Sequence, residues 1–265
     1  MSINQESKLR EAVLEHYREA AKKRETGGSS CCGSSGCCQP TASQISTAIG
    51  YTKEQLESLP KGANLGLGCG NPHLAARLKT GETVLDLGSG GGIDCFIAAR
   101  QVGPHGQVIG IDMTPEMVAL ARKQAEEAGV DNVSFRLGEI EHLPVADSSV
   151  DVIMSNCVVN LSPDKRAVYR EAFRVLKPGG RLAISDVVAY GPLPEELHAN
   201  LQAWSMCAAG ALPIDDLTAT LKEVGFEQVK VDVNRASRDL IVQWLPDSGI
   251  EDLLAAAVVE AVKPA

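Results

Sequence analysis

Apolar positions in the N-terminal part of the chain follow helical spacing. Over residues 7–25 they recur three or four residues apart and form one stripe, with charged residues on the other faces. The stripe consists of Leu9, Val13, Leu14, Tyr17 and Ala21. Residues 26–40 are rich in glycine, serine and cysteine, and this composition predicts a loop. Thr52 is a suitable N-cap for a short helix that follows it.

From residue 82 onward, short apolar runs alternate with segments of helical periodicity. The runs predict strands at residues 83–87, 107–111, 133–137, 150–154 and 181–187. The segments between them predict helices at residues 93–100, 115–128 and 165–176. Strands that alternate with helices are typical of a parallel sheet with right-handed crossovers. We therefore expect a doubly wound α/β fold.

The C-terminal part continues with two helices and two strands. We expect helices at residues 195–207 and 215–224, with Gly225 as the C-cap of the second. A strand is expected at residues 226–233. Residues 255–262 alternate loosely and predict a last strand at the edge of the sheet, with a helix as the alternative.

Composition narrows the class of protein. A net charge of −9 argues against a nucleic-acid partner, which would call for a basic surface. No apolar run approaches the length of a membrane span, and the polar N-terminus has no apolar leader core. We therefore expect a cytoplasmic protein that binds neither membrane nor nucleic acid. Thiols stay reduced in the cytosol, so clustered cysteines there indicate metal binding or catalysis rather than disulfides.

A glycine-rich turn follows the first strand of the expected sheet. Gly88 and Gly90 lie between that strand and a helix, where glycine permits a tight turn and a close approach to a ligand. Asp112 ends the next strand, where a carboxylate can accept the hydroxyls of a ribose. Asp86 precedes the turn and can orient the loop or the ligand. A dehydrogenase turn, or a turn without a ligand, is the alternative interpretation.

Eight cysteines are unusual for such an enzyme, and thiolates are soft ligands that suit soft ions. Cys95 lies inside the first helix that should pack on the sheet, and core packing explains it. Cys157 follows a strand end, which favours a ligand site over simple burial. The remaining thiols are Cys31, Cys32, Cys37, Cys38, Cys69 and Cys207.

Taken in order, these motifs resemble the class I S-adenosylmethionine-dependent methyltransferases over roughly residues 60–265. Besides the glycine turn they comprise Ile111 to Thr114, Gly138 to Glu141, Leu176 to Gly180, and Gly225-Phe226. The resemblance implies a seven-stranded, mostly parallel sheet with one antiparallel strand. It implies a cofactor site at Asp86, Gly88, Gly90, Asp112, Met113, Ile140, Glu141 and Asn156.

Within that family the segments around three cysteines resemble the arsenite methyltransferases. The resemblance implies that Cys69, Cys157 and Cys207 hold As(III), delivered as such or as a thiol conjugate, and that arsenic accepts the methyl group. It also implies a thiol reductant, thioredoxin or glutathione, and a role in arsenic detoxification. The implied organisation is an N-terminal extension at 1–60, a cofactor-binding core at 61–190, and arsenic-site helices with closing strands at 191–265.

The crowded cysteines at 31–38 depart from the family pattern. Cys32 is our choice for the family's upstream cysteine. One alternative is a structural zinc site, although adjacent Cys-Cys pairs are poorly spaced for zinc. Another alternative is a thiol segment that captures arsenite. For the whole chain the alternatives are a methyltransferase of another small molecule and a thiol-rich metal-binding protein on a methyltransferase scaffold. The sequence leaves open the number of methylations, antimony or organoarsenicals as substrates, and the oligomeric state.

Overall fold

A computed structural model describes residues 3–25, 41–242, 244 and 248–265 of the chain. Its centre is a seven-stranded sheet in the order β3-β2-β1-β4-β5-β7-β6. The strands are β1 (Thr83–Leu87), β2 (Gln107–Asp112), β3 (Val133–Leu137), β4 (Val150–Asn156), β5 (Leu176–Ala189), β6 (Glu227–Asn234) and β7 (Leu254–Val262). Strands β1 to β5 pair in parallel, and β7 pairs antiparallel with β5 and β6. The expected sheet with one reversed strand is confirmed.

The last strand does not occupy the edge that we expected. β7 lies between β5 and β6, so β6 is the edge strand. The burial patterns explain this placement. Residues 254–257 of β7 are buried on both faces of the sheet, whereas every second residue of β6 is exposed. A strand that is apolar on both faces belongs inside a sheet, and a charged, alternating strand protects an edge.

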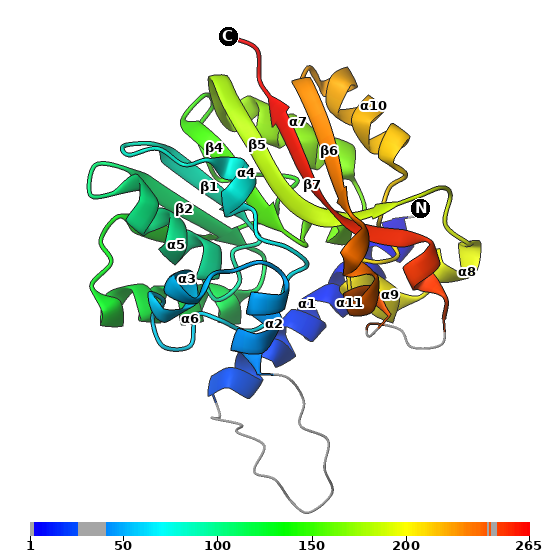
Figure 1. Cartoon of the computed structure of the whole chain (residues 1–265), viewed down its shortest axis with the longest axis horizontal. Coiled ribbons are helices and arrows are strands. Elements are labelled where there is room, and N and C mark those ends of the chain that lie inside the picture. Colours follow the sequence, from blue (N-terminus) through cyan, green and yellow to red (C-terminus); the bar gives the residue numbers. More distant parts are fainter. Residues whose placement is uncertain (1–2, 26–40, 243, 245–247) are drawn as a thin grey trace, which may run out of the picture.

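Helices cover both faces of the sheet (Figure 1). The helices α4 (His73–Ala76), α5 (Ile93–Val102) and α6 (Pro115–Ala128) pack on one face, around Val84, Phe96 and Val108. The helices α7 (Lys165–Val175) and α10 (Ile214–Val224) pack on the other face, around Leu85 and Leu182. Adjacent residues of β1 thus face opposite layers, as the two-residue period of a strand requires.

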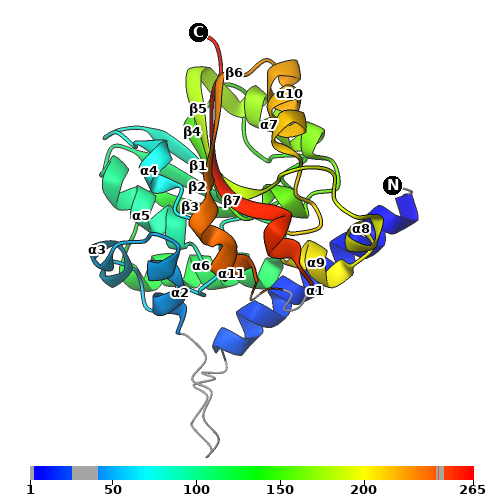
Figure 2. The ribbon, with the colours of Figure 1, turned by 45° about the vertical axis from the view of Figure 1, so that its right-hand side comes forward.

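The N-terminal helix α1 (Ile3–Glu25) packs against α6 and α9 (Leu201–Ser205). It lies below the sheet in both views (Figures 1 and 2). Leu9, Val13 and Ala21 of the expected stripe are buried, and Leu14 and Tyr17 are half-buried. Two short helices follow the undescribed segment: α2 (Ala42–Ala48) and α3 (Lys53–Glu57), which begins at its expected N-cap Thr52.

The helix that we expected at residues 195–207 is broken. It forms α8 (Glu195–His198) and α9, because the side chain of Asn200 caps a new helix by accepting hydrogen bonds from the backbone of Gln202 and Ala203. The remaining short elements are η1 (Val159–Leu161), η2 (Arg235–Ser237), α11 (Arg238–Ile241) and η3 (Ile250–Asp252). None of the helices in the described part of the chain has the length and apolar character that crossing a membrane requires.

The C-cap of α10 gives a test of the fold. Gly225 ends this helix at φ 116°, and a Cβ there would lie 3.1 Å from the Phe173 ring. We expect Gly225→Ala to lower the free energy of unfolding by roughly 1–2 kcal/mol, because an L residue is strained at positive φ. Urea denaturation measures the change. Gly191→Ala is the control, since no atom lies within 4 Å of its added Cβ. An unchanged urea midpoint for Gly225→Ala would refute this cap.

Candidate functional site

A cavity of about 390 Å³ lies beyond the carboxyl ends of β1, β2 and β4. This is the edge at which open α/β sheets bind ligands. All but one of the expected cofactor residues line it: Gly88, Gly90, Asp112, Met113, Ile140, Glu141 and Asn156. Among the expected arsenic ligands, Cys157 and Cys207 also line the cavity. The structure therefore brings the glycine turn and two of the thiols to one space.

The glycine turn is packed closely on one side and open on the other. A Cβ on Gly88 would lie 2.3 Å from a methyl group of Val158, so only glycine fits there. The backbone N–H of Gly90 donates to Asp112 Oδ2 at 2.9 Å, while a Cβ on Gly90 would meet no atom within 4 Å. The turn is thus fixed by the protein and leaves room for a ligand above Gly90.

Asp112 is held in place by the backbone around it. Its Oδ2 accepts from Gly90, and its Oδ1 accepts from the backbone N–H of Thr114 at 2.8 Å. Burial raises the pKa of this carboxyl, and the two backbone donors act in the opposite direction. The residue lines the cavity, where its carboxylate can accept hydrogen bonds from a ligand.

Asp86 does not line the cavity. It is buried beneath the turn, where the thiol of Cys95 donates to its Oδ2 at 3.2 Å. Burial raises the pKa of this carboxyl well above its ordinary value. Its assignment to the cofactor therefore stays a prediction. Cys95 is fully buried in the core, as we expected.

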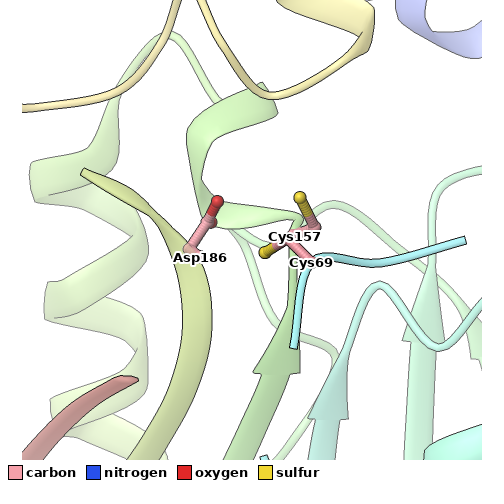
Figure 3. A group of neighbouring side chains, drawn as sticks. All are labelled: Cys69, Cys157 and Asp186. Carbon is pink, nitrogen blue, oxygen red and sulfur yellow. The ribbon is translucent and has the colours of Figure 1, made fainter. Parts of the chain in front are cut away.

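Three buried thiols from distant segments meet beside the cavity. Cys69 precedes the sheet, Cys157 follows β4, and Cys207 follows α9. The ligand atoms of Cys69, Cys157 and Asp186 all lie within 4.8 Å of one another (Figure 3). The Cys207 Sγ donates to the carbonyl oxygen of Cys157 at 2.6 Å. Cys32 and its three neighbouring cysteines lie outside the described residues.

Two of these cysteines adopt an unfavourable backbone conformation. Cys157 has φ 59° and Cys207 has φ 60°, the left-handed region that favours glycine. Such a conformation costs about 1–3 kcal/mol and persists where the surrounding structure imposes it. Strain of this kind is concentrated at functional sites, and here it occurs at two of the three predicted ligands.

Asn156 joins the Cys69 segment to the end of β4. Its Oδ1 accepts from the backbone N–H of Cys69 at 3.1 Å, and its Nδ2 donates to the Gly70 carbonyl at 2.7 Å and to the Tyr51 hydroxyl at 2.9 Å. A Cβ on Gly68 would lie 2.7 Å from the same amide. Asn156 thus both lines the cavity and holds Cys69 beside Cys157.

Comparisons with known proteins agree with this geometry. A methyltransferase-domain family model matches residues 78–225. An arsenite methyltransferase from Halobacterium salinarum is 46% identical over the whole of this chain, which spans 71% of that protein. The chain belongs to the arsenite methyltransferase family. A second member, from Aquipseudomonas alcaligenes, is 49% identical over 60% of this chain and 47% of its own length.

A solved structure extends the likeness to three dimensions. The crystal structure of an arsenic(III) S-adenosylmethionine methyltransferase from Chlamydomonas reinhardtii has a TM-score of 0.61 to this chain at 32% identity. The match covers 85% of this chain and 74% of that one. The class I methyltransferase fold expected from the sequence is therefore confirmed.

In this member of the family, the three thiols share their protons unequally. Hydrogen bonds from the Cys207 and Cys69 thiols lower the pKa of Cys157 to about 5. Hydrogen bonding to Cys157, and then burial, raises the pKa of Cys69; burial, and then Cys157, raises that of Cys207. The single proton of Cys207 serves either the sulfur or the carbonyl of Cys157 at one time. Cys157, which lines the cavity, is therefore the first of the three thiols to ionise.

Sequence reasoning missed several parts of this site. Arg10 of α1 lines the cavity, forms an ion pair with Glu139, and places Nη2 3.2 Å from Glu141 Oε1. Asp186, on β5, lies beside the thiols, and burial followed by the charge of Cys157 raises its pKa. The amphipathic stripe indicated that α1 packs against other elements, and Asp186 lies near the end of an expected strand. Neither pattern shows that Arg10 or Asp186 lies at the site.

The lowered pKa of Cys157 leads to a pH prediction. The pKa of Cys157 in the folded protein is lowered to about 5, while cysteines in an unfolded chain have a pKa of about 8.5. We expect one thiolate absorbance in the folded protein at neutral pH that disappears as the pH falls through about 5. Cys157→Ser should abolish it and Cys95→Ser should retain it. A wild-type protein without thiolate absorbance at neutral pH would contradict this assignment.

Proposed function

We propose that this protein transfers a methyl group from S-adenosylmethionine to As(III) bound by Cys69, Cys157 and Cys207. One observation carries the proposal. Two strained cysteines line a cavity that the glycine turn and Asp112 also line, and a third cysteine lies beside them. We further propose a cytoplasmic role in arsenic detoxification.

The cavity suits S-adenosylmethionine. Its volume falls within the range of about 300–1,000 Å³ that is usual for ligand sites. The carboxylate of Asp112 suits the ribose hydroxyls, Met113 and Ile140 offer apolar surface for the adenine, and Gly90 leaves room for the amino-acid part. The carboxylates of Asp94 and Asp112 favour a cationic ligand. When bound, S-adenosylmethionine supplies an electrophilic methyl group on a sulfonium.

The thiols suit As(III). The Cys157 thiolate faces the cavity and is the ready nucleophile for arsenic. As each As–S bond replaces an As–OH bond, the hydroxide leaves as water, with a proton from the thiols and, for the ionised Cys157, from solvent. Three sulfurs then hold arsenic with its lone pair free. No proton has to be removed from that lone pair, so methyl transfer requires no general base.

Two of the thiols also suit a later redox step. After methylation, arsenic is formally pentavalent, and two cysteine sulfurs can give it two electrons by forming a disulfide. Cys69 and Cys157, whose sulfurs lie within 4.8 Å of each other, are placed for this bond. A thiol reductant, thioredoxin or glutathione, then restores the two thiols by exchange.

Product analysis tests the function. Reduced protein incubated with arsenite, S-adenosylmethionine and a thiol should yield methylated arsenic and S-adenosylhomocysteine, both measured by mass spectrometry. Cys157→Ser should lower the rate at least about 100-fold, because the bound arsenic loses its position before the cofactor. Cys95→Ser, which changes a thiol outside the cavity, should retain the rate. A folded, cofactor-binding protein that yields no methylarsenic would refute the proposal.

The cofactor end has a separate test. Asp112→Asn should weaken S-adenosylhomocysteine binding by about 10-fold or more, since hydrogen bonds to a charged group contribute about 1.5–3 kcal/mol. Calorimetric titration measures the affinity. Arsenite binding should be unchanged, and the exposed Asp131→Asn should change neither affinity. Equal cofactor affinity in Asp112→Asn and wild type would exclude Asp112 from the cofactor site.

A further inference from the structure

Asn160 is a buried polar residue outside the cavity that contacts the Cys207 segment. Its side chain is 5% exposed, and its Nδ2 donates to the carbonyl oxygens of Val187 at 2.7 Å and of Cys207 at 3.2 Å. Both amide protons are thus committed to backbone carbonyls of two other segments. The side chain connects η1, β5 and the turn that carries the third thiol.

The backbone of Asn160 takes part in the same contact. Its N–H donates to Asp186 Oδ2 at 3.1 Å, which fixes η1 against β5. Its carbonyl oxygen packs directly on Gly210, where an added Cβ would lie 1.9 Å away. The turn from Cys207 to Gly210 therefore rests on Asn160 at both of its ends.

This contact explains how a strained conformation is maintained. Cys207 has φ 60°, which an isolated chain would avoid. One hydrogen bond of the Asn160 amide fixes the side chain to the Val187 carbonyl on β5, and the other holds the Cys207 carbonyl; close packing at Gly210 holds the far end of the same turn. Without the amide, the carbonyl of Cys207 would lose a buried partner and the turn could relax.

We propose that Asn160 is a positioning residue that places the Cys207 thiol at the arsenic site. The proposal rests on the proposed function and deepens it. Asn156 ties Cys69 to the end of β4, and Asn160 ties Cys207 to η1. Cys157 lies between the two asparagines. Five consecutive residues, 156–160, thus carry one ligand and hold the segments of the other two.

The test counts the sulfur atoms around bound arsenite by X-ray absorption spectroscopy and measures the arsenite affinity by calorimetric titration. The parent protein has serine at Cys31, Cys32, Cys37 and Cys38, so that the signal comes from Cys69, Cys157 and Cys207. In this parent we expect three sulfur neighbours. In Asn160→Ala we expect two sulfurs and one oxygen, with arsenite affinity lowered about 10-fold to 100-fold. S-Adenosylhomocysteine affinity should be unchanged, because Asn160 does not line the cavity.

Asn132 provides a matched control. Its Nδ2 also donates to two backbone carbonyls, those of Ala99 at 2.9 Å and Gly103 at 3.0 Å, at the C-terminal end of α5. Asn132→Ala therefore removes two bonds of the same kind and should lower the melting temperature without changing arsenite coordination. If Asn132→Ala loses the third sulfur as Asn160→Ala does, the effect is general destabilisation and the proposal is overturned.

Two further variants cover the case in which Asn160→Ala does not fold. Asn160→Ser keeps one donor and should show a smaller loss, and Gly210→Ala should displace the Cys207 turn because the added Cβ would clash with the Asn160 carbonyl oxygen. If Asn160→Ala, Asn160→Ser and Gly210→Ala all keep three sulfurs and the parent's arsenite affinity, the positioning role of Asn160 is overturned and the three-cysteine ligand set stands. Fewer than three sulfurs in the parent would overturn the three-cysteine ligand set, and this proposal with it.

Discussion

The site depends on the end of β4, where one short segment holds three thiols together. Cys69 precedes the first strand, Cys157 follows the fourth, and Cys207 follows α9, so no local interaction brings them together. Hydrogen bonds of the Asn156 and Asn160 side chains join the flanking segments to the residues around Cys157. Because β4 is paired on both sides with parallel strands, its end is a rigid base for these contacts.

Burial raises the free-energy cost of bringing these three thiols together, and it also tunes their ionisation. Cys157 and Cys207 adopt strained backbone conformations, and all three thiols lie in an apolar cluster with Trp204 and Val187. An apolar environment disfavours several adjacent charges, so the pKa of Cys157 is lowered while those of Cys69 and Cys207 are raised. A soft, thiophilic centre that replaces the thiol protons lets all three sulfurs bind as thiolates without adjacent uncompensated charges. The glycine turn and Asp112, which line the same cavity, take no part in that exchange.

Local signals identified the cofactor end of the site well. The turn at Gly88 and Gly90 lies between a strand and a helix that the apolar pattern alone predicts, and Asp112 ends the next strand. The three cysteines could be grouped only through a family resemblance, since their spacing in sequence says nothing about their distance in space. The predicted edge position of β7 was wrong because its sequence alternates only loosely, although part of the strand is buried on both faces. The cover formed by α1, the break at Asn200 and the contacts of Asn160 depend on long-range partners that no local pattern reveals.

A crystal structure of the protein with arsenite and S-adenosylhomocysteine tests the central claim most directly. The account predicts one arsenic atom bonded to the sulfurs of Cys69, Cys157 and Cys207, at the cavity end that faces the sulfur of the bound S-adenosylhomocysteine. The ribose of that ligand should contact Asp112. Arsenic bound elsewhere in the chain with the three thiols free, or S-adenosylhomocysteine bound away from the glycine turn, would contradict it.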